Sequence, residues 1–235
     1  MFESLKKQIP NLFTLANLSC GVMAIVSVLE SNLNEAALFI FAAVFFDFFD
    51  GFLARLLKVS GELGKQLDSL ADLVTFGVAP ALILYDMSLD AQGWTYDWLH
   101  YAFILVAIFS AYRLAKFNID TRQSDSFIGV PTPITGVMIA SWVFIYDSYP
   151  SVYEFIFYNQ WIFAFFCIVV SLLLISEIPL ISLKIKKGKS IHNYYPQLVL
   201  IAIGIVSFLI FNWLAFPIIY VVYVLSSVFI NFAKK

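Results

Sequence analysis

The sequence contains little charge, few basic residues, and few cysteines or histidines. Only 13% of its 235 residues are Asp, Glu, Lys or Arg, whereas 61% are hydrophobic. A typical soluble domain has about twice that share of charge, so an ordinary soluble enzyme and a disordered chain are both excluded. The two cysteines lie within apolar runs and the two histidines are isolated, which argues against a disulfide or a zinc site. With only 14 Lys and Arg, we expect no nucleic-acid partner.

Long apolar runs occupy most of the chain instead. About 20 helical residues cross a lipid hydrocarbon core, whereas barrel strands would be shorter and would alternate in polarity. We therefore predict an all-α integral membrane protein, a helical bundle of about eight transmembrane helices. Asn212, Trp213 and Pro217 predict a tight hairpin between the last two runs, and one long tilted helix is the alternative. The expected spans are 11–29, 36–57, 64–85, 99–118, 131–147, 151–176, 196–211 and 213–231.

The distribution of charge supports this count. With eight spans, all 14 Lys and Arg fall on one side of the membrane and the opposite loops contain only acidic residues. The positive-inside rule then places both termini in the cytoplasm. We expect an amphipathic juxtamembrane segment over 1–10, for which a polar leader is the alternative. A transmembrane core over 11–178, a basic cytoplasmic loop over 179–195 and a C-terminal helical hairpin over 196–235 follow.

Four aspartates lie inside two of the predicted spans. Asp47 and Asp50 are three residues apart and Asp68 and Asp72 are four apart, so each pair shares one face of a helix. A short turn near 59–61 makes the two helices antiparallel neighbours, which brings both pairs to a similar depth near the cytoplasmic surface. Ionisable residues inside a membrane are costly and are usually functional.

The residue types of this cluster indicate a metal site. Four carboxylates so close together cannot all remain ionised without cations. Because the cluster has only hard oxygen donors, it favours Mg²⁺ or Mn²⁺, with Ca²⁺ as a possible occupant, over Zn²⁺ or Cu²⁺. Two divalent cations would balance the four charges. A divalent-cation transporter is the remote alternative, although the acids lie toward one membrane face and no internal repeat is visible.

The segment 47–72, DFFDGFLARLLKVSGELGKQLDSLAD, resembles the signature of the CDP-alcohol phosphatidyltransferase family, D-x-x-D-G-x-x-A-R-x₈-G-x-x-x-D-x-x-x-D. Other segments resemble the branch of this family that uses L-serine: IPNLFTLANLSCG at 9–21, LVTFGVAPAL at 73–82, RLAKFNID at 113–120 and FIGVPTP at 127–133. The resemblance covers more than half of the chain and stops before the last two spans.

The resemblance implies an enzyme of the cell (inner) membrane whose active site faces the cytoplasm. It would transfer the phosphatidyl group of CDP-diacylglycerol to the hydroxyl of L-serine and release CMP. The family also implies a homodimer among membrane lipids, with six core helices, so that the two C-terminal spans would be a peripheral addition. A different acceptor, such as glycerol 3-phosphate or an inositol compound, and an ether-linked lipid donor remain alternatives.

The resemblance also assigns roles to residues. Asp72 would be the general base as well as a metal ligand. Thr14 and Asn17, one turn apart in the first span, could contact the nucleotide or could instead form hydrogen bonds between helices. The metal ligands would be Asp47, Asp50, Asp68 and Asp72, and the CDP moiety would contact Gly51, Ala54, Arg55 and Gly64.

The carboxylate of serine requires a cationic partner. Arg113, Lys116 and Arg122 are candidates near the cytoplasmic end of the fourth span, and Arg offers bidentate geometry. Anchoring at the membrane surface is the alternative for all three. Asn118 could hold the serine by hydrogen bonds or could cap the helix end. The sequence offers no Ser or Cys paired with a His, which argues against a covalent intermediate on the enzyme. Direct attack by serine on phosphorus is therefore expected.

Overall fold

The computed structural model describes residues 2–59, 61–91, 93–120, 128–180 and 195–232. These residues are helical apart from irregular connections and an isolated bridge between Ile128 and Pro179, which confirms the all-α class. The α-helices are α1 (Phe2–Leu29), α2 (Leu33–Leu57), α3 (Glu62–Asp72), α4 (Ala79–Leu89), α5 (Ile104–Ile119), α6 (Thr132–Ser148), α7 (Pro150–Phe157), α8 (Gln160–Ile175), α9 (Tyr195–Phe211) and α10 (Ala215–Phe232).

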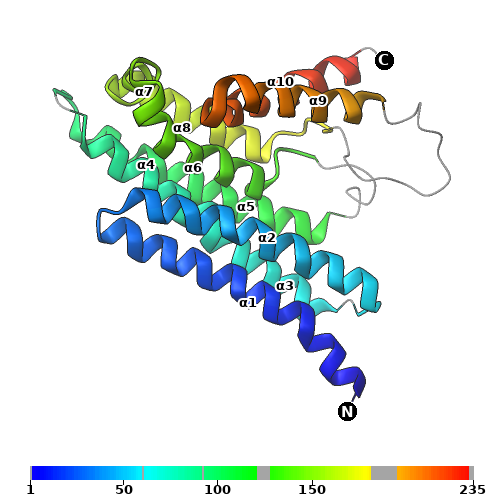
Figure 1. Ribbon diagram of the computed structural model, residues 1–235. Coiled ribbons are helices and arrows are strands. Elements are labelled where there is room, and N and C mark those ends of the chain that lie inside the picture. Colours follow the sequence, from blue (N-terminus) through cyan, green and yellow to red (C-terminus); the bar gives the residue numbers. More distant parts are fainter. Residues whose placement is uncertain (1, 60, 92, 121–127, 181–194, 233–235) are drawn as a thin grey trace.

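Helices α1 and α2 form an antiparallel pair along one side of the molecule (Figure 1). Their apolar segments, Gln8–Leu29 and Leu33–Leu57, are each long enough to cross a membrane. Asn32 caps α2, because its side-chain oxygen accepts a hydrogen bond of 3.3 Å from the backbone N–H of Glu35. The pair presents one face of α1 and one face of α2 to the rest of the bundle.

The N-terminal segment continues without a break into the first span. Residues 1–10 were predicted to be an amphipathic juxtamembrane segment, and α1 is helical from Phe2 to Leu29, with Pro10 inside it. Pro10 removes one backbone N–H from the helix, yet it lies buried against the bundle, where packing holds the helical path. The surface segment and the first span are therefore one helix in this structure.

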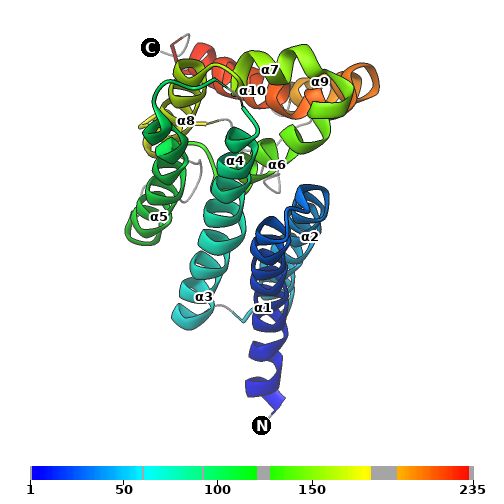
Figure 2. The same cartoon turned by 90° about the vertical axis from the view of Figure 1, so that its left-hand side faces the viewer.

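Helices α3 and α4 belong to one rod, which lies between α5 and the α1–α2 pair (Figure 2). The rod was expected to be an uninterrupted α-helix, but Leu73–Val78, directly after Asp72, winds as a π-helix. Two glycines of neighbouring helices explain the tight packing around this turn. A Cβ atom on Gly21 would lie 2.8 Å from the Cα of Thr75, and one on Gly136 would lie 2.9 Å from the Cα of Phe76. Short π-helical segments inside α-helices occur frequently at functional sites.

The sixth predicted span, 151–176, is not one straight helix. Helices α7 and α8 meet at an angle of 85° across a two-residue break. Asn159 caps the N-terminus of α8, because its side-chain oxygen accepts hydrogen bonds from the backbone N–H groups of Trp161 and Ile162 at 3.1 and 3.2 Å. The cap favours a helix start at this point and thus the break.

The C-terminal run Val199–Ile230 is strongly apolar but does not form one straight helix. It reverses at Asn212, which has a positive φ of 47°. A Cβ atom on Gly204 would lie 3.7 Å from Ile219, fifteen residues later, so α9 and α10 pack against each other as a hairpin. The hairpin lies beside α6, on the side away from α1 (Figure 1). The predicted loop at 179–195 falls largely outside the described residues.

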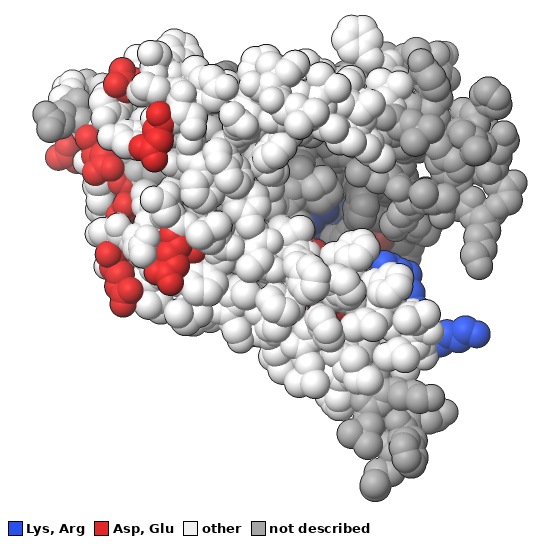
Figure 3. All heavy atoms as spheres, viewed as in Figure 1, with Lys and Arg blue, Asp and Glu red and all other residues white. Residues whose placement is uncertain are grey.

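Charge separates toward the two ends of the bundle. Figure 3 shows acidic side chains gathered at the end where α2 begins and α4 ends, and Lys and Arg atoms at the other end. Within the described residues, five helical segments are long and apolar enough to cross a membrane, or six when the bent pair α7–α8 is counted as one. The protein is therefore built to lie in a membrane.

Candidate active site

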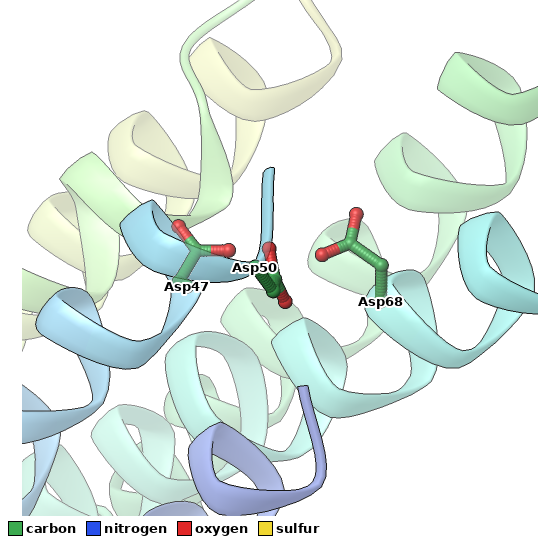
Figure 4. Close-up of side chains that lie close together, drawn as sticks. All are labelled: Asp47, Asp50 and Asp68. Atoms are coloured by element: carbon green, nitrogen blue, oxygen red, sulfur yellow. The ribbon is translucent and has the colours of Figure 1, made fainter. Parts of the chain in front are cut away.

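Three carboxylates converge between α2 and α3. Asp47, Asp50 and Asp68 each offer an oxygen atom, and these atoms all lie within 4.8 Å of one another. Figure 4 shows the three side chains pointing toward a common space. The spacing of three residues on α2 and the short connection to α3 contribute to this arrangement. The two helices were predicted to be antiparallel neighbours, but α3 packs against α1 and makes few contacts with α2. Three oxygen donors so close together are a candidate site for a divalent cation.

Asp72 stands one helical turn further along α3, beside this cluster but outside the group of three. It is only 7% exposed and lies close enough to interact electrostatically with Asp47 and Asp68. The side-chain amide of Asn17 donates a hydrogen bond of 3.2 Å to its Oδ1 atom. The π-helix begins at the next residue, Leu73. Asp72 is therefore held by α1 as well as by its own helix.

One face of α1 supports the acidic cluster. The hydroxyl of Thr14 donates a hydrogen bond of 2.7 Å to Oδ2 of Asp50 and a longer one of 3.2 Å to the carbonyl of Pro10. The hydroxyl of Thr75 donates a 3.1 Å hydrogen bond to the backbone carbonyl of Asn17. Of the two roles predicted for Thr14 and Asn17, hydrogen bonding between helices is therefore observed. It orients two of the four aspartates.

A cavity of about 440 Å³ opens beside the cluster. Asp50 and Asp68 form part of its wall, so the acidic cluster and the cavity are continuous. Small residues leave the remaining space open: a Cβ atom on Gly64 would lie 3.3 Å from Oδ1 of Asn11. The lining residues are Pro10, Asn11, Thr14, Asp50, Gly51, Ala54, Val59, Gly61, Glu62, Gly64, Lys65 and Asp68.

The predicted nucleotide-contacting residues divide into two groups. Gly51, Ala54, Gly64 and Thr14 line the cavity, whereas the lining does not include Arg55 or Asn17. The guanidinium of Arg55 lies beside the cavity wall, because a Cβ atom on Gly51 would be 3.4 Å from its Nη1 atom. Asn17 lies behind the acidic cluster, where it holds Asp72.

Sequence reasoning missed three polar residues of the cavity, Asn11, Glu62 and Lys65. A signal for Asn11 was present, because Asn11, Thr14 and Asn17 recur every three residues and so share one face of α1. Lys65 follows Gly64 directly, and its ammonium donates a hydrogen bond to the backbone carbonyl of Asn118. In the sequence, Lys65 was interpreted only as one of the positive charges that indicate which side of the membrane is cytoplasmic.

Arg113 is buried inside the bundle rather than anchored at its surface. It is only 6% exposed, and its Nη1 atom donates a hydrogen bond of 3.2 Å to the hydroxyl of Thr132 at the start of α6. Its Nε–H is buried without a hydrogen-bond partner. Asp72 lies close enough to interact with it electrostatically. Among the described residues that were predicted to bind serine, Arg113 thus lies near Asp72.

The other predicted serine-binding residues make structural contacts. Lys116 forms an ion pair with Glu177, beyond the end of α8. The side-chain amide of Asn118 donates a hydrogen bond of 2.9 Å to Ser69 on α3. Both contacts fasten the end of α5 to its neighbours, and a role in binding serine stays a prediction. Arg122 lies outside the described residues.

Comparison with known proteins identifies the family. A sequence model described as CDP-alcohol phosphatidyltransferase matches residues 7–173. CDP-diacylglycerol–serine O-phosphatidyltransferase of Bacillus subtilis is 42% identical over 143 residues, which are 59% of this chain and 77% of the relative. Archaetidylserine synthase of Methanothermobacter thermautotrophicus is 34% identical over 72% of this chain and 68% of its own length. CDP-diacylglycerol–serine O-phosphatidyltransferase of Helicobacter pylori is 35% identical over 72% and 70%. This chain belongs to the CDP-alcohol phosphatidyltransferase family.

Proposed function

We propose that this membrane protein transfers the phosphatidyl group of CDP-diacylglycerol to the hydroxyl of L-serine and releases CMP. The observation that carries the proposal is the convergence of Asp47, Asp50 and Asp68, of which Asp50 and Asp68 line the 440 Å³ cavity. The names of the relatives support the acceptor, because the bacterial and archaeal enzymes alike are serine transferases. The names of these relatives differ in the lipid, which is a diacylglycerol lipid in two and an archaetidyl lipid in the third. The serine acceptor is therefore the better supported part of the assignment.

The acidic cluster fits divalent cations. It presents only carboxylate oxygens, the ligands that Mg²⁺ and Mn²⁺ prefer and that Ca²⁺ can also use. Asp47, Asp50 and Asp68 would hold the metal, and with Asp72 their four negative charges would balance two divalent ions. Cations bound there would supply charge stabilisation for the pyrophosphate and for the departing CMP.

The cavity fits the nucleotide part of the donor. Gly51, Ala54 and Gly64 leave its wall open, and Thr14 adds a hydroxyl to it. Lys65 and Asn11 provide an ammonium and an amide at the same wall, where both can donate hydrogen bonds to phosphate oxygens. Arg55, beside the wall, adds a second positive charge. The diacylglycerol chains would remain in the bilayer next to the protein.

Asp72 is placed to act as the general base. The Asn17 amide holds its carboxylate beside the cluster, where a carboxylate can accept a proton. The serine hydroxyl oxygen forms a bond to the phosphorus that carries diacylglycerol, and its proton passes to Asp72. The bond between that phosphorus and the bridging oxygen breaks, and CMP leaves with the electron pair.

Arg113 is the candidate partner for the serine carboxylate. Its buried guanidinium has an unused Nε–H donor, and it lies near Asp72, the proposed base for the serine hydroxyl. An Arg fork matches a carboxylate by two parallel hydrogen bonds. The serine would thus be held at its carboxylate by α5 and deprotonated from α3.

We further place the acidic cluster at the cytoplasmic face of a cell (inner) membrane, with eight crossings and both termini inside. The support is the separation of charge along the bundle, because cytoplasmic segments carry the excess of Lys and Arg (Figure 3). In this arrangement 11–178 is the catalytic core, 179–195 is a basic cytoplasmic loop and 196–235 is the last hairpin. Assembly as a homodimer follows from the family resemblance alone and stays a prediction.

The test uses membranes that contain the full chain. CDP-diacylglycerol, labelled L-serine and Mn²⁺ or Mg²⁺ are supplied, and both label in lipid and CMP release are followed. We expect metal-dependent serine lipid that disappears with a chelator and with Asp72→Asn. The matched control is Asp86→Asn, an aspartate near the opposite end of the bundle, which should leave the activity intact.

Other outcomes would contradict separate parts of the proposal. CMP release only with glycerol 3-phosphate or an inositol compound would refute serine as the acceptor and retain the transferase. Serine lipid formed only from an ether-linked donor would change the lipid and retain the acceptor. No CMP release with any acceptor, from protein shown to be folded, would refute the transferase and favour cation transport by the aspartates.

A further inference from the structure

Two tyrosines of α10 are buried on a helix whose other face is exposed. Tyr220 and Tyr223 are 4% and 6% exposed, whereas Val221 and Leu225 are 52% and 55% exposed. They are three residues apart and so share the face that packs on α6. A buried tyrosine hydroxyl usually requires a polar partner, which directs attention to what this face of α10 meets.

The two tyrosines meet the surroundings of Arg113. Both lie close enough to interact electrostatically with its guanidinium. The hydroxyls of Tyr220 and Thr135 are 3.4 Å apart, within hydrogen-bonding distance, and Thr132 accepts the hydrogen bond from Arg113. These five residues, which we term the Arg113 cluster, join α5, α6 and α10.

The charge at the centre of the Arg113 cluster is not neutralised inside it. Within the described part of the chain, no carboxylate lies within salt-bridge distance of Arg113, and its Nε–H has no hydrogen-bond partner. A guanidinium is a donor only, and burying one without an anion is costly. The Thr132 hydroxyl accepts one of its hydrogen bonds and so partly offsets this cost, and the Tyr220 and Tyr223 oxygens lie near enough to act on the guanidinium electrostatically. They leave donors available for an anion from outside.

We propose that Tyr220 and Tyr223 are positioning residues that orient Arg113 toward the carboxylate of the acceptor. This inference rests on the proposed serine transfer and adds α10 to its acceptor site. It also changes the reading of the C-terminal hairpin, which was expected to be a peripheral addition and lies beyond residue 173, where the family match ends. In this chain the hairpin closes the acceptor side of the site. Figure 3 shows a hollow between α2 and the α9–α10 layer with charged atoms at its floor.

The test replaces each tyrosine by phenylalanine in the full chain, which keeps the ring and removes the hydroxyl. We expect Tyr220→Phe and Tyr223→Phe to raise the KM for serine about three- to tenfold, because a hydroxyl dipole that acts on the charged guanidinium is lost. The KM for CDP-diacylglycerol should stay within twofold. The control is Tyr153→Phe, which removes an equally buried hydroxyl that donates to Met87 at 3.3 Å near the opposite end. It should leave both KM values unchanged.

A double-mutant cycle separates positioning from packing. If the tyrosines act through Arg113, adding Tyr220→Phe to Arg113→Lys should change the KM for serine by less than twofold further. Additive effects, equal changes in both KM values, or no change in either tyrosine variant would refute the proposal. If the unmodified protein releases CMP but forms no serine lipid, the proposed function itself fails and this inference falls with it. Serine lipid with unaltered tyrosine variants refutes the inference alone.

Discussion

The hydrogen bond from Thr14 to Asp50 offers a sharp test of how α1 supports the metal site. Thr14→Val keeps the shape of the side chain and removes the only hydrogen that the hydroxyl donates. The bond is 2.7 Å long and goes to a carboxylate, and the same hydroxyl also lies 3.2 Å from the Pro10 carbonyl. A hydrogen bond to a charged group contributes about 1.5–3 kcal/mol. Because this hydrogen is shared, we take the lower value of about 1.5 kcal/mol, which corresponds to roughly tenfold in an equilibrium constant.

The assay is the dependence of serine-lipid formation on Mn²⁺ concentration. We expect Thr14→Val to raise the Mn²⁺ concentration for half-maximal activity about tenfold, within the range known for residues that orient metal ligands. The rate at saturating Mn²⁺ should fall less, because Asp50 is still present. The control is Ser19→Ala, since Ser19 is exposed on α1 and donates only to the carbonyl of Leu15 at 2.8 Å. An unchanged Mn²⁺ requirement in Thr14→Val, with Asp50→Asn inactive, would refute the idea that α1 orients the metal ligands.

Three further predictions follow from the same geometry. Gly64→Val should raise the KM for CDP-diacylglycerol about tenfold by filling the cavity. Gly204→Ala on α9 should leave this KM unchanged, and initial rates measured at varied CDP-diacylglycerol concentrations would show the difference. Gly136→Val should lower the temperature of unfolding in detergent, because its Cβ would lie 2.9 Å from the backbone of Phe76, and an unchanged temperature would contradict the tight packing described. Chelation should abolish activity, and Mn²⁺ or Mg²⁺ should restore it while Zn²⁺ should not, as titration of each metal into chelated membranes would reveal.

The acidic cluster could be predicted from the sequence because short-range rules determine it. Helical spacing puts Asp47 and Asp50 on one face, and the short connection after Leu57 starts α3 at the end of the bundle where α2 finishes. Hydropathy likewise locates the apolar helices, because a lipid environment requires each backbone to satisfy its own hydrogen bonds. No knowledge of distant contacts is needed for either step.

The features that the sequence did not reveal depend on distant contacts. The π-helix at Leu73–Val78 coincides with close approaches of Gly21, which lies 52 residues before its start, and of Gly136, which lies 58 residues after its end. The bend between α7 and α8 was hidden because apolar residues continue on both sides of it. The residues around Arg113 could not be predicted either, since Tyr220 lies more than a hundred residues away in a run without any recognisable motif.

In the proposed reaction one aspartate serves two substrates, and these distant contacts bear on the acceptor. Asp72 lies near Asp47 and Asp68, on α2 and α3, and near Arg113 on α5. The proposed donor site draws mainly on residues of the signature. The proposed acceptor site draws on three helices far apart in the chain. We therefore expect substitutions that change the acceptor to lie outside the signature, in α5, α6 and α10, whereas substitutions within the signature should abolish transfer to every acceptor.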